Sequence, residues 1–413
     1  MNKDNKPISI PSLLLGDKII ETILTDSGTR LLVGNQNGYE VVDHFDSEGQ
    51  RYIPVNSKSD LFRNEIVTFT RQPLPYENVV TLHSEIKEYI VRYVTLPKQF
   101  LEVASAYVLL TWVYDAFAEI PYLRFQGDFG TGKTRALLSV GSLCRKPMKA
   151  GGASTISPIF HLLDKYQGTL ILDEADFKWS DETHEIVKIL NNGNMKGFPV
   201  LRSQLNKDKN YEPRAFSVYG PKLIAMRGSY EDVALESRFL TGNMRRGEKA
   251  PDIPHSLPKE MKEAAEVLTR KLLSYRLQNL HSIHTVPVLP ELSDRGHQIL
   301  GPLLAVAPTE EARAAILSER KSAEETLDFD RTWSLEGSIL RAIVSLSDGA
   351  EAITIGAIAK VLRTQDFGDL KFLSHAMIGK TIRERLGLSL YKSRGVITLL
   401  PGQEIIARNM SLN

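Results

Sequence analysis

The chain has 413 residues and a formal net charge of +1, with 42% hydrophobic and 24% charged residues. This length exceeds what one hydrophobic core usually organises, so two or three folded domains are expected. The near-neutral charge excludes a generally polycationic protein, and the single cysteine, Cys144, excludes an internal disulfide framework and a cysteine-cluster metal site.

No apolar run has the length that a signal peptide or a membrane span requires. The N-terminus opens on polar residues, and the longest apolar run, around Ala106 to Tyr114, predicts a buried helix. A single cysteine fits a reducing compartment. We therefore expect a soluble, cytoplasmic protein without a membrane partner.

The first part of the chain, residues 1–75, is predicted to form a small β-rich domain. Short alternating runs, such as Thr29 to Val33 and Tyr39 to Val42, are separated by Asp-Ser-Gly, Asn-Gly and Ser-Glu-Gly turn signals. Helix-like spacing of apolar residues then predicts a helical segment at residues 76–120, which leads into the next domain.

Residues 121–246 are predicted to form an α/β domain, because strand-like runs alternate with helical ones. This alternation is typical of a parallel sheet. Strands are expected at Tyr122–Gln126, Thr169–Leu172 and Lys222–Met226, and helices from Lys133 and near Thr183–Asn191.

The strongest motif follows the first of these strands. Residues 127–134 read Gly-Asp-Phe-Gly-Thr-Gly-Lys-Thr, which matches the Walker A pattern. A strand before it and a helix after it direct backbone N–H groups toward phosphate oxygens, so the motif predicts ATP binding. We expect Lys133 to contact the β- and γ-phosphates and Thr134 to bind Mg²⁺. The expected ATP-binding residues are Gly127, Asp128, Phe129, Gly130, Thr131, Gly132, Lys133, Thr134 and Arg135.

Two carboxylates end the next predicted strand. Asp173 and Glu174 follow the apolar run Thr169–Leu172, forty positions after Lys133. We expect Asp173 to hold Mg²⁺ through its water shell and Glu174 to orient and polarise the attacking water. Acids commonly follow buried strands, so it is the spacing from the Walker A motif that makes this pair specific.

The rest of the chain is predicted to be mainly helical. A proline-rich stretch, Gly247–Pro258, precedes helices at roughly Lys259–Leu280 and Glu291–Glu325, which together predict a helical lid at residues 247–328. The final segment, residues 329–413, is predicted to form a winged helix. Its expected elements are helices at Leu335–Leu346, Thr354–Leu362 and Ser374–Leu386, capped by Ser374, and a hairpin at Leu390–Leu400.

Basic side chains gather on the third helix and on the hairpin turn of this winged helix. Such a placement favours contact with a duplex, although winged helices also dock proteins. The expected DNA-binding residues are Lys380, Arg383, Arg385, Lys392 and Arg394.

Beyond single motifs, the chain resembles the helicase-like P-loop ATPase domains of the AAA+ type that accompany primases in phages, plasmids and other mobile elements. These are themselves similar to the minichromosome-maintenance and superfamily 3 helicases. The resemblance extends from about Leu82 to about Glu325. It rests on Tyr122–Thr134, Leu170–Asp176, Ile189–Gly197, Pro221–Ala225, Ala234–Phe239, Asp294-Arg295 and Gly301–Ala305.

The resemblance implies roles for further residues. Arg238 occupies the place of an arginine finger that enters the nucleotide site of a neighbouring subunit, and guanidinium suits that role. A surface or salt-bridged arginine is the alternative. At the position of a polar sensor the chain reads Met226-Arg227, so Arg227, and Arg295 in the lid, are only candidates for sensors.

The resemblance also implies a hairpin that projects into a central pore. The extended runs Val200–Leu205 and Tyr211–Val218 flank a polar turn, where Lys207 and Lys209 are expected to contact DNA phosphates. A solvated hairpin tip is the equal alternative for this composition.

Taken together, these patterns predict an ATP-dependent DNA helicase or translocase in mobile-element or phage DNA replication. It would use ATP and Mg²⁺, act on single-stranded or forked DNA, form a homo-oligomeric ring, expected to be a hexamer, and depend on a separate primase. The alternatives are an AAA-type remodeller or loader that does not separate strands, and an ATP-switched winged-helix DNA-binding regulator.

Overall fold

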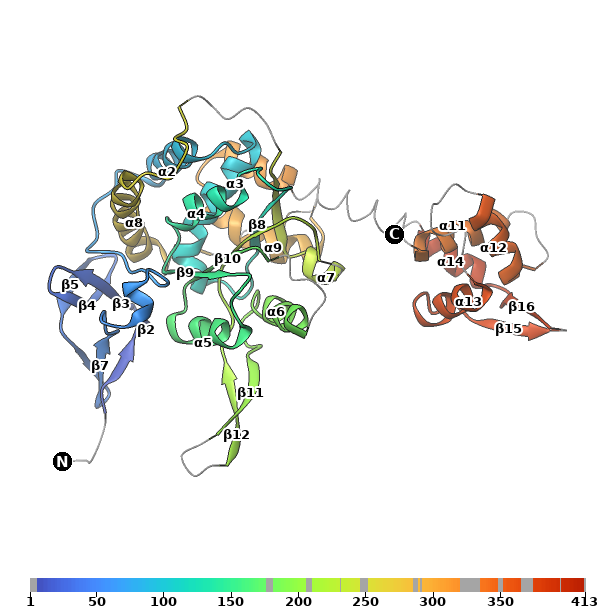
Figure 1. Cartoon of the computed structure of the whole chain (residues 1–413), viewed down its shortest axis with the longest axis horizontal. Coiled ribbons are helices and arrows are strands. Elements are labelled where there is room, and N and C mark those ends of the chain that lie inside the picture. The colour runs from blue at the N-terminus through green and yellow to red at the C-terminus, as the bar shows by residue number, and fades with distance from the viewer. Residues whose placement is uncertain are drawn as a thin grey trace. The chain divides into compact units, whose positions relative to one another are not determined.

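A computed structural model describes residues 6–175, 181–205, 210–230, 232–245, 252–284, 289, 292–319, 335–347, 352–364, 374–393 and 395–411. The chain divides into two compact units, one of residues up to 321 and one from residue 322 onwards. Figure 1 shows the elements of both units. No helix in the described ranges combines the length and apolarity that crossing a membrane requires.

The N-terminal part of the first unit is β-rich, as predicted. Strands β2 to β5 form an antiparallel sheet in chain order. A second, mixed sheet has the order β1-β7-β6, in which β7 pairs in parallel with β1 and antiparallel with β6. Side chains alternate between the faces of β3, so Ile20 packs within the β-region, whereas Ile19 and Ile23 enter the core of the helices that follow. The strands are β1 Ile8–Ile10, β2 Ser12–Leu15, β3 Lys18–Thr25, β4 Gly28–Asn35, β5 Gly38–Val42, β6 Phe45–Ser47 and β7 Gln50–Pro54.

The centre of the unit is a five-stranded sheet in the order β14-β8-β13-β10-β9, and every pairing in it is parallel. This confirms the α/β architecture with a parallel sheet. Because all the strands run the same way, their carboxyl ends share one edge, where loops can assemble a site. The strands are β8 Tyr122–Gln126, β9 Pro147–Gly151, β10 Thr169–Asp173, β13 Lys222–Met226 and β14 Phe239–Asn243.

Helices cover both faces of this sheet (Figure 1). In β10, Ile171 packs into the core on one face, while Leu170 and Leu172 pack into the core on the other face. The first core includes α2 Val79–Tyr93, α3 Lys98–Val113, α4 Lys133–Gly141, α8 Glu260–Asn279 and α9 Asp294–Val306, and the second includes α5 Ile156–Tyr166 and α6 Asp181–Asn192. Both faces are buried, which explains why the strands are almost continuously apolar.

A segment from the N-terminal region covers one lateral edge of the five-stranded sheet. After the short helix α1 Asp60–Arg63, residues 66–68 run antiparallel to the edge strand β9, with Val67 opposite Met148. Lys149 N donates to the Ile66 carbonyl at 2.9 Å, and Thr68 N donates to the Pro147 carbonyl at 3.4 Å. The ladder groups of β9 are therefore partly satisfied by the N-terminal region.

A buried cluster of charges links the N-terminal sheet to the rest of the unit. Glu21 of β3 accepts hydrogen bonds from Arg145 at 2.6 Å and from Arg276 of α8 at 2.8 Å. Arg276 also binds Asp115, in the short 3-10 helix η1 Tyr114–Ala116, and Lys146 Nζ lies 3.0 Å from Glu21 Oε2. The three guanidinium and ammonium groups hold the pKa of Glu21 well below its usual range, against the effect of burial, which alone would raise it.

The predicted hairpin is present as β11 Val200–Leu205 and β12 Tyr211–Phe216, paired antiparallel. It projects beyond α5 and α6 (Figure 1). Its base is anchored, because Val200 and Phe216 are buried in the core that contains α5. Residues 206–209, with Lys207 and Lys209, lie outside the described residues.

The lid differs from its prediction in one respect. Instead of one helical stretch over Glu291–Glu325, α9 ends at Val306 and a further helix occupies residues 310–319. Pro308 explains the break, because a proline disfavours the helical conformation of the residue before it, and Ala307 has a ψ of 115°.

The second unit contains the three predicted helices and the predicted hairpin. Ser374 caps the third helix by accepting a hydrogen bond from Met377 N at 3.2 Å, as predicted. A further helix after the hairpin was not predicted. The elements are α11 Leu335–Ser347, α12 Ile355–Thr364, α13 His375–Glu384, β15 Leu390–Ser393, β16 Val396–Leu399 and α14 Gln403–Ser411.

Candidate nucleotide-binding site

The Walker A segment forms a tight loop between β8 and α4. Gly127, Gly130 and Gly132 have φ angles of 158°, 75° and 90°, which glycine adopts without the strain of a side chain. A Cβ on Gly127 would lie 2.3 Å from the Met244 carbonyl oxygen, so only glycine fits there. The loop therefore leaves its backbone free to approach a ligand closely.

Within the loop, two side chains donate hydrogen bonds to the same backbone carbonyl. The Asp128 carbonyl accepts hydrogen bonds from Lys133 Nζ at 2.7 Å and from Thr131 Oγ1 at 2.8 Å. Lys133 begins α4, so its ammonium and the helix N-terminus lie on the same side of the loop. Phe129 is 80% exposed, whereas the Arg135 guanidinium donates to the carbonyls of Tyr93 and His255.

The two predicted metal-binding side chains lie together. Thr134 Oγ1 donates to Asp173 Oδ1 at 3.2 Å, although the residues are 39 positions apart. Hydroxyl and carboxylate oxygens are the donors that Mg²⁺ prefers. The residues present therefore fit a Mg²⁺-bound nucleoside triphosphate.

Glu174 has an unusual backbone. Its φ is 54°, in the left-handed region that few residues with side chains adopt. A Cβ on the neighbouring Gly152 would lie 2.7 Å from the Glu174 carbonyl oxygen, so a glycine is needed beside it. Glu174 is exposed at the carboxyl edge of the sheet, and backbone strain of this kind is common where a side chain is held for function.

Polar groups that the sequence interpretation missed lie at the same edge. Gln126 ends β8 next to Met226, the last residue of β13, and its amide donates to Ser229 Oγ at 3.1 Å. Arg227 follows β13 and is exposed. Gln126 and Ser229 are therefore further candidates for the polar sensor, besides Arg227. Arg295, the other sensor candidate, donates from its Nε to Ser237 Oγ at 3.3 Å.

A buried ion pair supports the loops at this edge. The two terminal guanidinium nitrogens of Arg124 each donate to one carboxylate oxygen of Glu236 at 2.6 Å, and the two side chains are 4% and 12% exposed. Arg124 lies on β8 and Glu236 on the short helix α7 Val233–Glu236. Because such a bidentate pair fixes both partners, it positions α7 relative to the strand that leads into the Walker A loop.

Arg238 lies at the amino-terminal ends of the strands, opposite the end that carries the Walker A loop. Its carbonyl accepts from Tyr122 N, at the start of β8, whereas Gly127 follows the end of that strand. Five residues at about 3.3 Å each place Arg238 roughly 16 Å along the strand from the Walker A loop. Its guanidinium donates to Asn194 Oδ1 at 3.0 Å, to Asn191 Oδ1 at 2.8 Å and to the Ala234 carbonyl. Arg238 therefore does not reach the Walker A loop of its own chain.

Asn191 connects Arg238 to the start of α7. Its amide nitrogen donates to Asp232 Oδ2 at 2.9 Å while its oxygen accepts from Arg238. The Asn191 hydrogen bond, together with the Leu235 and Ala234 N–H groups and the Arg238 charge, lowers the pKa of Asp232. The two asparagines lie in the segment that carried the family resemblance, but the sequence alone gave them no role.

A buried lysine links this segment to the hairpin. Lys222 has no exposed surface, and its Nζ donates to the carbonyls of Gly193 at 3.1 Å and of Val218 and Gly220 at 2.9 Å. Burial holds its pKa well below the usual range. Lys222 thereby joins the base of the hairpin to the residue before Asn194.

The expected DNA-binding residues are only partly described. Arg394, like Lys207 and Lys209, lies outside the described residues. Lys380, Arg383 and Lys392 are exposed, and Arg385 is exposed and paired with Glu336. Lys380 lies 3.8 Å from Glu384.

No protein-family model and no curated protein matches the chain. Among solved structures, the apo C-terminal region of NrS-1 is similar at a TM-score of 0.39 and 13% identity, covering 92% of this chain and 95% of that one. An active helicase, SCCmec type IV Cch, is similar at a TM-score of 0.42 and 12% identity, covering 98% of this chain and 80% of that one. JCV helicase is similar at a TM-score of 0.25 and 15% identity, covering 65% of this chain and 66% of that one. These values are too low to transfer an activity to this chain.

Proposed function

We propose that the protein is an ATP-dependent DNA helicase or translocase that works as a homo-oligomeric ring, expected to be a hexamer, in mobile-element or phage DNA replication. The observation that carries the proposal is the junction of the Walker A loop with β10, where Thr134 Oγ1 and Asp173 Oδ1 lie 3.2 Å apart beside Glu174 and Lys133. This geometry serves phosphoryl transfer to water.

Each residue has a defined part in that chemistry. Mg²⁺ bound with ATP would neutralise charge on the phosphates. Lys133 and the N-terminus of α4 hold the phosphate oxygens, Thr134 and Asp173 provide oxygen donors for the cation, and Glu174 orients the attacking water and takes up its proton.

The placement of Arg238 supports a ring. A guanidinium held at the opposite edge of the sheet by Asn191 and Asn194 can serve a nucleotide site only on another subunit. In a closed ring, each subunit would present Arg238 to the site of its neighbour, where it would neutralise charge on the transferring phosphoryl group.

This arrangement is tested by mixing two inactive variants. Arg238→Ala should bind ATP but hydrolyse it poorly, and Lys133→Ala should not bind it. In a mixed ring, an Arg238→Ala subunit next to a Lys133→Ala subunit has a complete site, so about a quarter of the sites should recover in an equimolar mixture. The readout is steady-state ATPase activity after verified subunit exchange.

A matched control uses two defects that fall in the same site. Lys133→Ala mixed with Glu174→Gln should remain inactive, because no subunit in that mixture carries both residues. If the Arg238→Ala mixture also remains inactive, Arg238 does not act on a neighbour, and the ring loses its main support.

The hairpin supports DNA as the substrate. In the sequence, Lys207 and Lys209 lie between its two strands, and Tyr211, which begins β12, is 77% exposed. Lysines can neutralise backbone phosphates, and an exposed aromatic ring can stack on a base without sequence preference. The proposal therefore assigns the hairpin to single-stranded DNA and the basic face of α13 to duplex DNA.

The rivals differ in their products. A remodeller or loader would hydrolyse ATP without displacing a strand, and a regulator would hydrolyse slowly and prefer one DNA sequence. The exposed basic residues of α13 favour the regulator as second candidate. A strand-displacement assay on forked DNA with Glu174→Gln as control separates these outcomes, since only a helicase yields free strand in an ATP-dependent way.

A further inference from the structure

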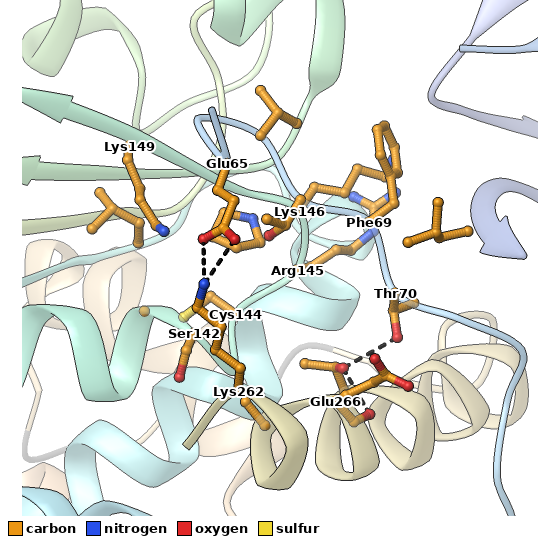
Figure 2. A pocket seen from close by; sticks show the side chains of 18 of the residues that line it. Glu65, Phe69, Thr70, Ser142, Cys144, Arg145, Lys146, Lys149, Lys262 and Glu266 are labelled. Atoms are coloured by element: carbon orange, nitrogen blue, oxygen red, sulfur yellow. Dashed lines mark hydrogen bonds and ion pairs between the residues drawn. The ribbon is translucent and has the colours of Figure 1, made fainter. Parts of the chain in front are cut away.

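A cavity of about 520 Å³ lies apart from the Walker A loop, between α8, the segment 62–70 and the end of α4. Figure 2 shows side chains that line it. The α4 residues at its wall are Leu138 and Gly141, and a helix rises 1.5 Å per residue, so Leu138 lies about 8 Å along the helix from Lys133. The cavity is therefore a separate site that shares a helix with the nucleotide site.

The lining of the cavity is mainly apolar, although the buried charge cluster of Glu21, Arg145 and Lys146 also borders it. Its lining includes Trp112, Leu138, Ile171, Met261 and Leu273. A space of this volume falls within the range of about 300–1,000 Å³ that small-molecule pockets occupy. Its shape and lining suit the apolar body of a ligand.

Several charged side chains lie at the mouth of the cavity. Lys262 of α8 binds Glu65 at 2.7 Å and Lys149 of β9 lies on the same side of the cavity (Figure 2). Glu266, also at the mouth, pairs with Arg71 at 3.3 Å. Within the described part of the chain, Lys149 has no carboxylate at ion-pair distance. The cavity lining as a whole contains four basic residues and three acidic ones, so basic residues exceed acidic ones by one: Arg145, Lys146, Lys149 and Lys262 against Glu21, Glu65 and Glu266.

We propose that this cavity binds a small amphipathic anion, with an aromatic or aliphatic body against Trp112 and Met261 and a carboxylate, sulfonate or phosphate group at Lys149 and Lys262. Because α8 and α4 both line the cavity, such a ligand contacts the lid and the helix that begins at the Walker A lysine. The proposal does not depend on the helicase assignment.

A fluorescent anion with an aromatic body, anilinonaphthalene sulfonate, tests the apolar part of the site. Titrated into the full chain, it should bind saturably. Ala265 is 6% exposed and lines the cavity, so Ala265→Trp should abolish this binding by filling the space. Val267 lies on the same helix and is 46% exposed, so Val267→Trp is the matched control and should retain it.

The basic residues of the proposed site are tested with separate variants. These variants remain informative if Ala265→Trp fails to fold. Lys149→Met should weaken binding about tenfold, the loss expected for one charge-assisted hydrogen bond, while Lys98→Met, at an 87% exposed side chain, should not. Naphthoate should displace the probe better than uncharged naphthamide or inorganic phosphate. Unchanged binding in Lys149→Met, or in a folded Ala265→Trp variant, overturns the proposal.

Discussion

The buried lysine Lys146 makes the stability of the first unit depend on pH in a predictable direction. Its side chain is 5% exposed, its Nζ lies 3.0 Å from Glu21 Oε2, and the charges of Arg145 and Arg276 act on it. Burial, reinforced by the repulsion of Arg145, lowers the pKa of Lys146 from 10.5 to about 7. In the unfolded chain the ammonium returns to its ordinary pKa.

Between these two values the unfolded chain binds more protons than the folded chain. Stability must then rise with pH, at up to about 1.4 kcal/mol per pH unit. Integrated from pH ~7 to pH ~9, with half of the folded molecules protonated at the start, the gain is about 2 kcal/mol. The gain builds up between the two pKa values, is complete only above the unfolded value of 10.5, and is lost as the pH falls back toward the folded value of about 7.

The assay is urea unfolding at both pH values for the parent chain and for Lys146→Met. Methionine leaves Glu21 paired with Arg145 and Arg276, so this variant should fold. Its free energy of unfolding should lack the rise of about 2 kcal/mol. Other groups, such as Cys144, titrate in both chains and cancel in the difference.

Lys98→Met is the control, since an 87% exposed lysine should leave the parental pH dependence intact. The reasoning is wrong if the parent and Lys146→Met gain the same stability between the two pH values, or if the parent becomes less stable as the pH rises.

Three further predictions follow from the nucleotide site and its surroundings. Gly127→Ala should fold but lose ATP binding in a fluorescent-nucleotide titration, because the new methyl group would lie 2.3 Å from the Met244 carbonyl; unchanged affinity contradicts this. Glu236→Gln should lower the free energy of unfolding by about 3–5 kcal/mol, because it leaves the Arg124 charge buried, and a cost below about 1 kcal/mol would show a dispensable pair. Lys207→Ala combined with Lys209→Ala should reduce the salt slope of single-strand binding by about 1.4 while basal ATPase persists, and an unchanged slope would remove the hairpin tip from the DNA contact.

The sequence predicted those parts of the fold that local patterns determine. The strands at Tyr122, Thr169 and Lys222 and the hairpin at Val200 were confirmed because each is an apolar or alternating run beside a turn signal. By contrast, β9 and β14 were missed. Pro147–Gly151 contains a proline and a glycine, and Phe239–Asn243 contains a glycine and an asparagine, so only their places in the sheet make them strands.

In the candidate site, too, local sequence patterns predicted some features, whereas others depend on the tertiary fold. The Walker A loop and the contact between Thr134 and Asp173 follow from motif spacing and from the shared edge of a parallel sheet. The links from Lys222 to Gly193 and from Arg124 to Glu236 join residues 29 and 112 positions apart. No local pattern indicates such pairs, because buried charges acquire partners only through the tertiary fold.

The short segment that pairs with β9 affects how readily the protein aggregates in concentrated solution. A bare edge strand offers its N–H and C=O groups to any passing strand, and this is how sheets of different molecules join into aggregates. Residues 66–68 occupy that position on β9. A chain shortened to start at residue 76 would retain every predicted nucleotide-binding residue, yet we expect it to be aggregation-prone. We therefore expect the N-terminal region to protect the central parallel sheet from intermolecular strand pairing, whether or not a ligand is bound.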